Sequence, residues 1–231
     1  DDHGAWCGWR LGDAVQRLRW IPPGAFMMGS PEGEPGRYDD EGPQHRVVIG
    51  AGFWLAETAC TQALWQAVMG DNPSEFVDPE RPVERVSWDD VTKFIDVLSD
   101  RGPGLGLTLP SEAQWEYACR AGTDMPFSTG MTITTDQANF DGRRPYQGDA
   151  KGEYRQKTMP VRRFRPNRWG LWQMHGNVWE WCVDDWYDNH RGAPATAKPR
   201  RRLKLFGTKS KVLRGGSWFS NPRGLRSAAR D

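Results

Sequence analysis

Hydrophobic residues recur with the helical period of about 3.6 residues in three stretches of the chain. Each stretch begins with a hydroxyl residue that can cap a helix, namely Thr61, Ser87 and Ser111. After Ser87 and Ser111, an Asp or a Gln three positions later has the spacing of a capping box. The pattern predicts helices over 62–69, 88–99 and 112–121, of which the first and last end at a glycine.

Short apolar runs with strand-like composition lie between and after these stretches. They predict strands over 18–21, 26–28, 46–49, 53–56, 178–183 and 212–214. Residues 124–167 show little periodicity, and an irregular region of that length inside a compact domain is usually functional. We expect a single α+β domain over 1–231, with its helices in the first half and its later loops laid on a small antiparallel sheet.

Composition supports a loop-rich fold. The chain has 13 Trp, 26 Gly and 17 Pro in 231 residues, which indicates many tight turns and a core built from large flat side chains. This composition excludes a helical bundle. Four scattered cysteines form no zinc-binding pattern, so we expect reduced, mostly buried thiols.

Charge is nearly balanced, with 31 basic and 30 acidic residues and a net charge of +1, so no overall field favours nucleic acid or anionic lipid. The exception is the segment 198–211, from Lys198 to Lys211, whose charged residues are all basic. It could contact phosphate or a lipid head group, but a solvated loop is the favoured interpretation. We find no membrane span and no signal peptide, and expect a cytoplasmic protein.

Motifs for nucleotide binding, a nucleophilic serine or a zinc protease are missing from the sequence. The four histidines are widely separated, so each is expected to be structural. Three carboxylates, Asp184, Asp185 and Asp188, suggest a site for a cation or a sugar, although ordinary surface carboxylates are the favoured alternative.

The densest group of unusual residues is NRWGLWQMHGNVWEWCVDDW, residues 167–186. Gly176 and Asn177 form a strong turn signal. On the strand that follows, Trp179 and Trp181 share one face and Glu180 takes the other. Glu180 with backbone carbonyls of the turn would suit calcium. A core strand in which Glu180 accepts hydrogen bonds from backbone amides is an equal alternative.

Six stretches together resemble a known family: WIPPGAFMMGSPEGE, FWLAETACTQALWQAVMGDNPS, RPVERVSWDDV, LTLPSEAQWEYACRAGT, GLWQMHGNVWEWC and VLRGGSWF. They are similar, in the same order, to the formylglycine-generating enzyme family, also called the sulfatase-modifying domain. The resemblance covers residues 20–231. It implies a variant of the C-type lectin fold that is low in regular structure, with two main helices and a twisted antiparallel sheet.

The resemblance bears on activity through two positions. Oxidase members of the family use a pair of cysteines after the RGGS motif to bind copper and convert a substrate cysteine to formylglycine. The matching positions here are Ser220 and Leu225, and neither side chain supplies the soft sulfur that Cu(I) prefers. We expect no bound copper and no oxidase activity. The three-histidine motif of the iron-dependent sulfoxide synthases is also missing from this sequence.

The resemblance also implies two structural calcium sites. The first matches Gln173 and Glu180 by their side chains and Gly176 and Val178 by their carbonyls. The second matches only in part, at Asn139, Phe140, Glu153 and Arg155.

Non-catalytic relatives include the variable proteins of diversity-generating retroelements, whose binding surface ends in a segment very similar to LRGGSWFSNPRGLRSAARD, residues 213–231. The resemblance implies a fixed framework of Leu213, Arg214, Gly215, Gly216, Ser217, Trp218, Pro222, Arg223, Arg226, Ser227, Ala228 and Arg230. The displayed positions would be Phe219, Ser220, Asn221, Gly224, Leu225, Ala229 and Asp231, and Trp218 would join them in the ligand site. An ordinary closing strand and loop is the alternative.

Three functions remain open at this stage. The favoured one is a display protein that binds a protein or other macromolecular ligand through residues 213–231. The others are an oxidase with an unrecognised metal centre, and an accessory or regulatory domain of a larger bacterial effector. Family members continue from the arginine-rich segment to a further strand, so we also expect this chain to lack its final strand.

Overall fold

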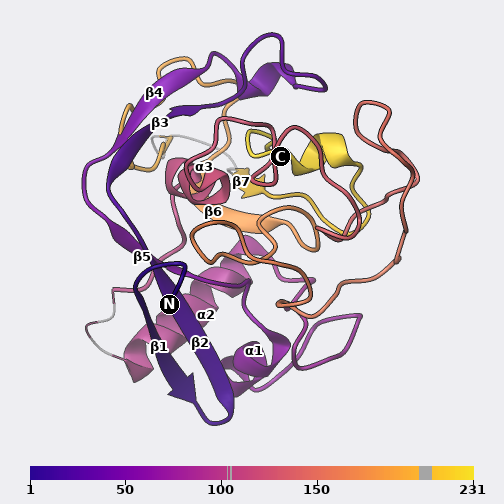
Figure 1. The fold of residues 1–231 in the computed structure, drawn as a ribbon. Helices are drawn as coiled ribbons and strands as arrows, with labels where there is room; N and C mark the ends of the chain where they lie inside the picture. The colour runs from indigo at the N-terminus through magenta and orange to yellow at the C-terminus, as the bar shows by residue number, and fades with distance from the viewer. Residues whose placement is uncertain (103, 105, 203–209) are drawn as a thin grey trace.

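The computed structural model describes residues 1–102, 104, 106–202 and 210–231 (Figure 1). Towards one end of the molecule, the strands β1 (Trp6–Leu11), β2 (Ala14–Ile21) and β5 (Phe53–Ala56) lie near the helices α1 (Gln62–Met69) and α2 (Trp88–Arg101). The helix α3 (Glu112–Arg120) and the strands β6 (Glu180–Asp185) and β7 (Lys211–Arg214) lie at the centre. The strands β3 (Gly24–Met28) and β4 (His45–Ile49) lie on one side of them and irregular loops on the other. Helices together with small antiparallel sheets confirm the predicted α+β architecture.

The three predicted helices are present, with the predicted N-caps. They are α1 (Gln62–Met69), α2 (Trp88–Arg101) and α3 (Glu112–Arg120). The Thr61 hydroxyl accepts a hydrogen bond from the Leu64 amide at 3.2 Å, and complete capping boxes start the other two helices. The capping residues therefore predicted the helix starts correctly. The end of α2 was predicted at residue 99, whereas the helix extends to Arg101.

The strands form three separate antiparallel groups rather than the one small sheet that we expected. They are β1 (Trp6–Leu11), β2 (Ala14–Ile21) and β5 (Phe53–Ala56); β3 (Gly24–Met28) and β4 (His45–Ile49); and β6 (Glu180–Asp185) and β7 (Lys211–Arg214). Strand β1 was not predicted. It is the outer strand beside β2 and most of its residues are exposed, so it lacks the alternating burial that marks a strand in a sequence.

The predicted irregular region is confirmed, since residues 121–179 contain only turns, bends and isolated bridges. Its side chains nevertheless form a packed core of their own, made of Phe127, Ile133, Ala138, Phe140 and Tyr146 together with Leu225. The loops are thus held by hydrophobic burial rather than by a backbone ladder. Leu225 ties them to the C-terminal segment.

Buried arginines attach the C-terminal segment to the rest of the fold. The guanidinium of Arg226 is fully buried and donates to Glu34 at 2.6 Å and to Glu41 at 2.7 Å. Desolvation by burial raises the pKa of Glu34, although Arg226 opposes that shift. An arginine fork that binds two carboxylates fixes both the position and the orientation of the segment.

Two further arginines contact the buried face of α3. Arg230 makes a two-pronged bond to Glu112, at 2.7 and 2.9 Å, while Arg214 pairs with Glu116. Burial alone would raise the pKa of Glu112, but the neighbouring Arg230 and Arg214 hold it at about 2. We call the contacts of Arg214, Arg226 and Arg230 with Glu34, Glu41, Glu112 and Glu116 the arginine–glutamate network.

The last residue of the chain lies beside β7. The Asp231 amide donates to the Leu213 carbonyl at 3.0 Å, and the Leu213 amide donates to the Asp231 carbonyl at 2.7 Å. The expected absence of a final strand stays a prediction.

Replacement of Arg226 by Met should lower the free energy of unfolding by about 3–5 kcal/mol, because it leaves Glu34 and Glu41 buried without their partner. Arg143→Met is the matched control: Arg143 is 65% exposed and pairs with Asp141 at the surface, so the cost should be about 1 kcal/mol or less. Urea denaturation measures both. Equal losses in the two variants would contradict the structural role of the network.

Candidate functional site

The segment after β7 turns sharply at two glycines. Gly215 and Gly216 have φ angles of 92° and 74°, in the left-handed region that other residues avoid. A Cβ on Gly216 would lie 2.9 Å from the Gly224 carbonyl oxygen, so the close approach of this turn to the following one requires glycine. The two glycines of this GGS turn therefore change the direction of the chain sharply, and Phe219 and Asn221 of the following loop are exposed.

Residues 217–225 form a compact, internally bonded loop. The Ser220 amide donates to the Ser217 carbonyl, and the Ser220 hydroxyl accepts from the Ser217 amide, at 3.0 and 3.1 Å. The Asn221 side chain caps the short 3₁₀ helix η2 (Pro222–Leu225) by accepting from the Arg223 amide at 3.0 Å. Two predicted ligand-binding residues, Ser220 and Asn221, thus also shape the loop.

Aromatic rings surround Trp218. Phe76 and Phe219 meet it edge-on, with ring centroids 5.6 and 5.2 Å away, and Tyr154 is stacked on it at 6.0 Å. Phe219 is 57% exposed. An exposed phenylalanine at the edge of a packed ring cluster is an available contact for a partner.

A depression of about 360 Å³ lies beside this cluster. We call it the aromatic groove, and its ring-bearing wall consists of Phe76, Trp179, Trp181, Trp218 and Phe219. Glu75, Glu84 and Arg85 contribute charged groups to its lining. Arg85 has a φ of 61°, a conformation that is unusual for a residue with a side chain. The groove joins the 75–86 loop, the start of β6 and the C-terminal segment.

Burial divides the predicted display positions. Phe219, Asn221 and Asp231 are exposed, and Trp218, Ser220 and Gly224 are partly exposed. Leu225 and Ala229 are only 0% and 1% exposed, so their predicted display is wrong. Leu225 fills the core of the loop region, and Ala229 lies between two anchoring arginines, where the chain has no access to solvent.

The expected alternation around Glu180 is present. Trp179 and Trp181 both line the aromatic groove, whereas Glu180 accepts a hydrogen bond from the Trp115 indole nitrogen at 2.7 Å. The alternative in which backbone amides bind Glu180 is wrong, because an indole of α3 is the donor. Burial raises the pKa of Glu180 to about 7.

Of the residues matched to the first calcium site, Gln173 offers a free side-chain oxygen. The side-chain amide nitrogen of Gln173 donates to the Pro160 carbonyl at 2.6 Å, while its oxygen is buried and accepts no hydrogen bond. The Gly176 carbonyl lies in a tight turn in which it accepts from the Val178 amide at 3.0 Å. The buried, unpartnered oxygen of Gln173 is compatible with a cation ligand.

The second calcium match is less complete. The side-chain oxygen of Asn139 is likewise buried without a donor, and Phe140 follows it in the loop core. Glu153, however, is 61% exposed and pairs with Arg155 at 2.9 Å. Among the described residues, no group of three His, Cys, Asp or Glu side chains is arranged around a metal position.

The aspartates after WEWC have structural roles. Asp184 accepts hydrogen bonds from the Glu112 amide, at the start of α3, and from the Arg200 amide, at 2.8 and 2.6 Å. Asp185 pairs with Lys211 at 2.7 Å, and Asp188 accepts from the Trp186 indole at 3.2 Å. The suggested cation or sugar site is therefore not formed by these residues. Asp184 and Asp185 instead bind the backbone and side chains of neighbouring segments.

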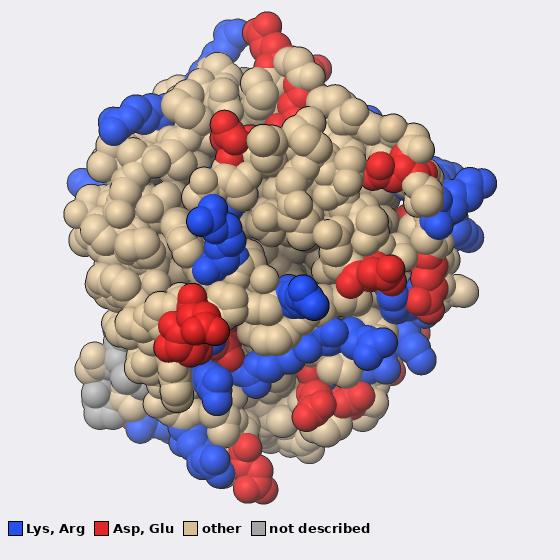
Figure 2. Space-filling model, in the orientation of Figure 1, with Lys and Arg blue, Asp and Glu red and all other residues tan. Residues whose placement is uncertain are grey.

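The basic segment 198–211 is only partly described, since 203–209 lie outside the described residues. In the described part, the Arg200 guanidinium donates to the Asn189 carbonyl at 2.7 Å and lies 3.7 Å from the Tyr187 ring centroid. Lys198, Arg201 and Arg202 are exposed. Elsewhere, on the face drawn in Figure 2, basic side chains form a row with acidic ones interspersed.

All four cysteines are free, as predicted. Cys119 and Cys182 are buried, Cys60 is half-buried and Cys7 is exposed. Burial raises the pKa of the Cys119 thiol to about 12, which makes it a poor nucleophile.

His175 is structural, as expected. Its Nδ1 donates to the Leu225 carbonyl at 2.7 Å, and its Nε2 accepts from the Ser128 amide at 3.0 Å, so both partners require the neutral ring. Burial lowers its pKa to about 4. The structure also brings His45 and His190 together, with ring centroids 5.3 Å apart, a pairing that their sequence separation concealed.

The contribution of His175 to stability should fall as the pH drops from about 6.5 to about 4, because this residue binds a proton in the unfolded chain but not in the folded one. The loss from this residue is about 3 kcal/mol. His175→Gln should remove that part of the pH dependence. It should leave the contribution of His190, whose pKa is also lowered to about 4, and the opposite contribution of Glu180, whose pKa is raised to about 7. His3→Gln, near the N-terminus, is the control. Denaturation curves that depend on pH equally in His175→Gln and the unsubstituted protein would disprove this assignment.

Comparison with known proteins gives the family. A model described as "Sulfatase-modifying factor enzyme 1-like domain" matches residues 12–231. The formylglycine-generating enzyme of Streptomyces coelicolor is 34% identical over 212 residues, which cover 89% of this chain and 57% of that protein. The chain thus spans little more than half the length of this relative. The serine/threonine-protein kinase pkn1 of Chlamydia caviae is 31% identical over 244 residues, 91% of this chain but 34% of the kinase.

Solved structures agree with the family match. The structure of PvdO from Pseudomonas aeruginosa superposes with a TM-score of 0.78 at 27% identity, over 97% of this chain and 91% of that one. The Treponema denticola variable protein 1 superposes with a TM-score of 0.77 at 26% identity, over 99% and 93%. The chain therefore belongs to the sulfatase-modifying factor, or formylglycine-generating enzyme, family and has its C-type lectin-like fold.

Proposed function

We propose that this chain is a non-catalytic member of its family that binds a peptide or protein ligand in the aromatic groove. The observation that carries the proposal is the exposed ring of Phe219 beside a depression of about 360 Å³ walled by four further aromatic side chains. Large rings that lose little side-chain entropy on binding dominate the energetics of protein interfaces. A ligand that inserts an apolar side chain into the groove would contact them together.

The backbone around the aromatic groove is held by buried contacts, so the exposed side chains on it can be substituted. The arginine–glutamate network and the GGS turn fix the backbone, while Phe219, Asn221 and Asp231 have exposed side chains. Substitutions at exposed positions leave the buried contacts in place. The overall similarity to the Treponema denticola variable protein 1 supports the same interpretation.

Oxidase chemistry is disfavoured by the two positions that match the copper cysteines. The Ser220 hydroxyl is engaged with Ser217, and Leu225 is a fully buried hydrocarbon side chain. Soft sulfur ligands are the ones that Cu(I) prefers. Copper-dependent conversion of a peptide cysteine to formylglycine, detected by mass spectrometry, would overturn the non-catalytic assignment.

A second candidate is an accessory domain of a larger protein. The observation that favours it is the match to the Chlamydia caviae kinase, of which this chain corresponds to only 34%. Sequencing the natural gene and its surroundings distinguishes the display protein from the accessory domain. A nearby near-copy of the codons for 213–231 that differs only at adenines would favour display, and a natural chain that continues into a kinase or protease would favour the accessory role.

The display proposal predicts that peptides selected from a random phage library on this protein depend on Phe219. Phe219→Ala should weaken their binding about tenfold or more, because the ring is an exposed anchor of the groove. Trp54→Ala, which removes an exposed ring of β5 outside the groove, should leave the affinity unchanged. Peptides that bind Phe219→Ala and Trp54→Ala equally well would contradict the proposed site.

Calcium would serve as a structural cofactor at the turn before β6. Gln173 and Glu180 would supply side-chain oxygens, and Gly176 and Val178 carbonyl oxygens. This set suits a hard cation, and its single carboxylate favours weak rather than tight binding. A cation here would fix the turn that precedes the groove strand.

After chelator treatment, calcium at 100 times its dissociation constant should stabilise the protein by about 2.7 kcal/mol, because only the folded chain assembles the oxygens. Gln173→Ala should abolish the increase in melting temperature. Gln66→Ala, at an exposed position of α1, should retain it. A melting temperature that calcium leaves unchanged, or raises equally in both variants, would refute the site.

A further inference from the structure

A second cavity, of about 390 Å³, lies between two irregular segments and shares no lining residue with the aromatic groove. Residues 128–137 form one side of it and residues 165–175 the other. Its apolar wall consists of Ile133, Pro166, Leu171 and Met174. The volume lies at the lower end of the range of small-molecule sites, about 300–1,000 Å³.

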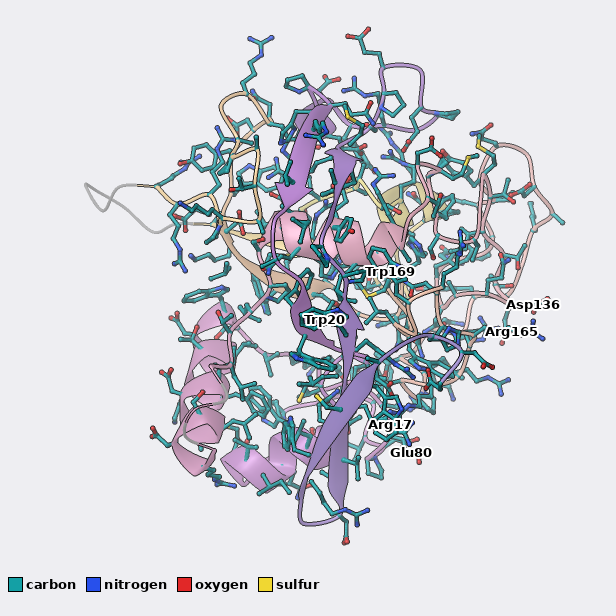
Figure 3. The ribbon with its side chains drawn as sticks, turned by 60° about the vertical axis from the view of Figure 1, so that its left-hand side comes forward. Arg17, Trp20, Glu80, Asp136, Arg165 and Trp169 are labelled. Atoms are coloured by element: carbon teal, nitrogen blue, oxygen red, sulfur yellow. The ribbon has the colours of Figure 1, made fainter. Side chains whose placement is uncertain are left out.

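Three charged side chains line this cavity: Asp136, Arg165 and Arg168. All three are exposed, and none makes a hydrogen bond or ion pair through its side chain to another described residue. Figure 3 shows Asp136 and Arg165, which come from different segments, projecting on the same side of the molecule. These three side chains are therefore available for a ligand.

Two polar side chains of the cavity wall, His175 and Asn167, are already engaged. Both ring nitrogens of His175 have partners, as described above. The Asn167 side chain accepts from the Trp169 and Leu171 amides at 3.0 and 3.1 Å and donates to the Ala118 carbonyl at 2.9 Å. These bonds fix the walls, so the cavity is a preformed shape with its unpartnered charges at the lining.

We propose that this cavity binds a small zwitterion, an α-amino acid with an apolar side chain. The carboxylate of the ligand would meet the guanidinium groups of Arg165 and Arg168, which match carboxylate geometry. Its ammonium group would meet Asp136. The apolar wall would receive the side chain, and its burial would contribute the hydrophobic part of the affinity.

The charge pattern selects this class over simpler ions. Inorganic phosphate would use the two arginines, but the carboxylate of Asp136 would repel it. A neutral apolar molecule would fill the cavity and leave all three charges without partners while restricting their access to water. Only a ligand with both signs of charge satisfies the whole set.

Isothermal titration calorimetry with L-leucine as the probe tests the proposal on the whole protein. L-Leucine should bind, whereas N-acetyl-L-leucine, which lacks the ammonium group, and L-leucinamide, which lacks the carboxylate, should each bind about tenfold more weakly or worse. No measurable binding of L-leucine, or tighter binding of inorganic phosphate, would overturn the proposal.

Substitutions at Arg165 and Asp136 should not disturb folding, because both side chains are exposed. Arg165→Gln and Asp136→Asn should each weaken L-leucine binding about tenfold. Arg163→Gln, an exposed neighbour that does not line the cavity, should have no effect. Equal affinity in Arg165→Gln and Arg163→Gln would contradict the site. The outcome is independent of the aromatic groove, because Phe219→Ala should leave L-leucine binding unchanged.

Discussion

The burial of arginine charges is the constraint on which the C-terminal half of this fold depends. Arg214 and Arg226 are fully buried, and each is stable there only because glutamates from distant parts of the chain meet it. The partners come from α3 and from the 34–41 loop, so one set of ion pairs joins three regions. In a fold with so little regular structure, these ion pairs hold distant segments together, as the backbone hydrogen bonds of a larger sheet do in other folds.

The buried arginines divide the C-terminal segment 213–231 into residues that anchor it and residues that are exposed on its surface. The chain alternates between residues that are buried with the network and residues that face outward from it, of which Phe219 is the most prominent. The loop between them is closed by its own hydrogen bonds and by the GGS turn. A surface built in this way can change its chemistry without changing its backbone, which is the physical requirement for a display protein.

Sequence reasoning succeeded where the signal was local. Hydroxyl caps located the three predicted helices, and the turn at Gly176 placed a strand over 178–183, two residues before the observed β6 (Glu180–Asp185). It failed where tertiary context decides. The exposed strand β1 has no alternating pattern, and the burial of Leu225 depends on a loop core formed by residues about 80–100 positions earlier in the sequence. A leucine among small and polar residues was the one available hint. No sequence signal indicated that Asp136 and Arg165 would line one cavity.

A substitution scan of residues 213–231, with the fraction folded measured for every variant, tests the account most directly. Phe219, Asn221 and Asp231 are predicted to accept most side chains, whereas Arg214, Leu225, Arg226 and Arg230 are predicted to accept almost none. An outcome in which the buried arginines are freely replaceable, or in which Phe219 is as intolerant as they are, would contradict the division into framework and surface.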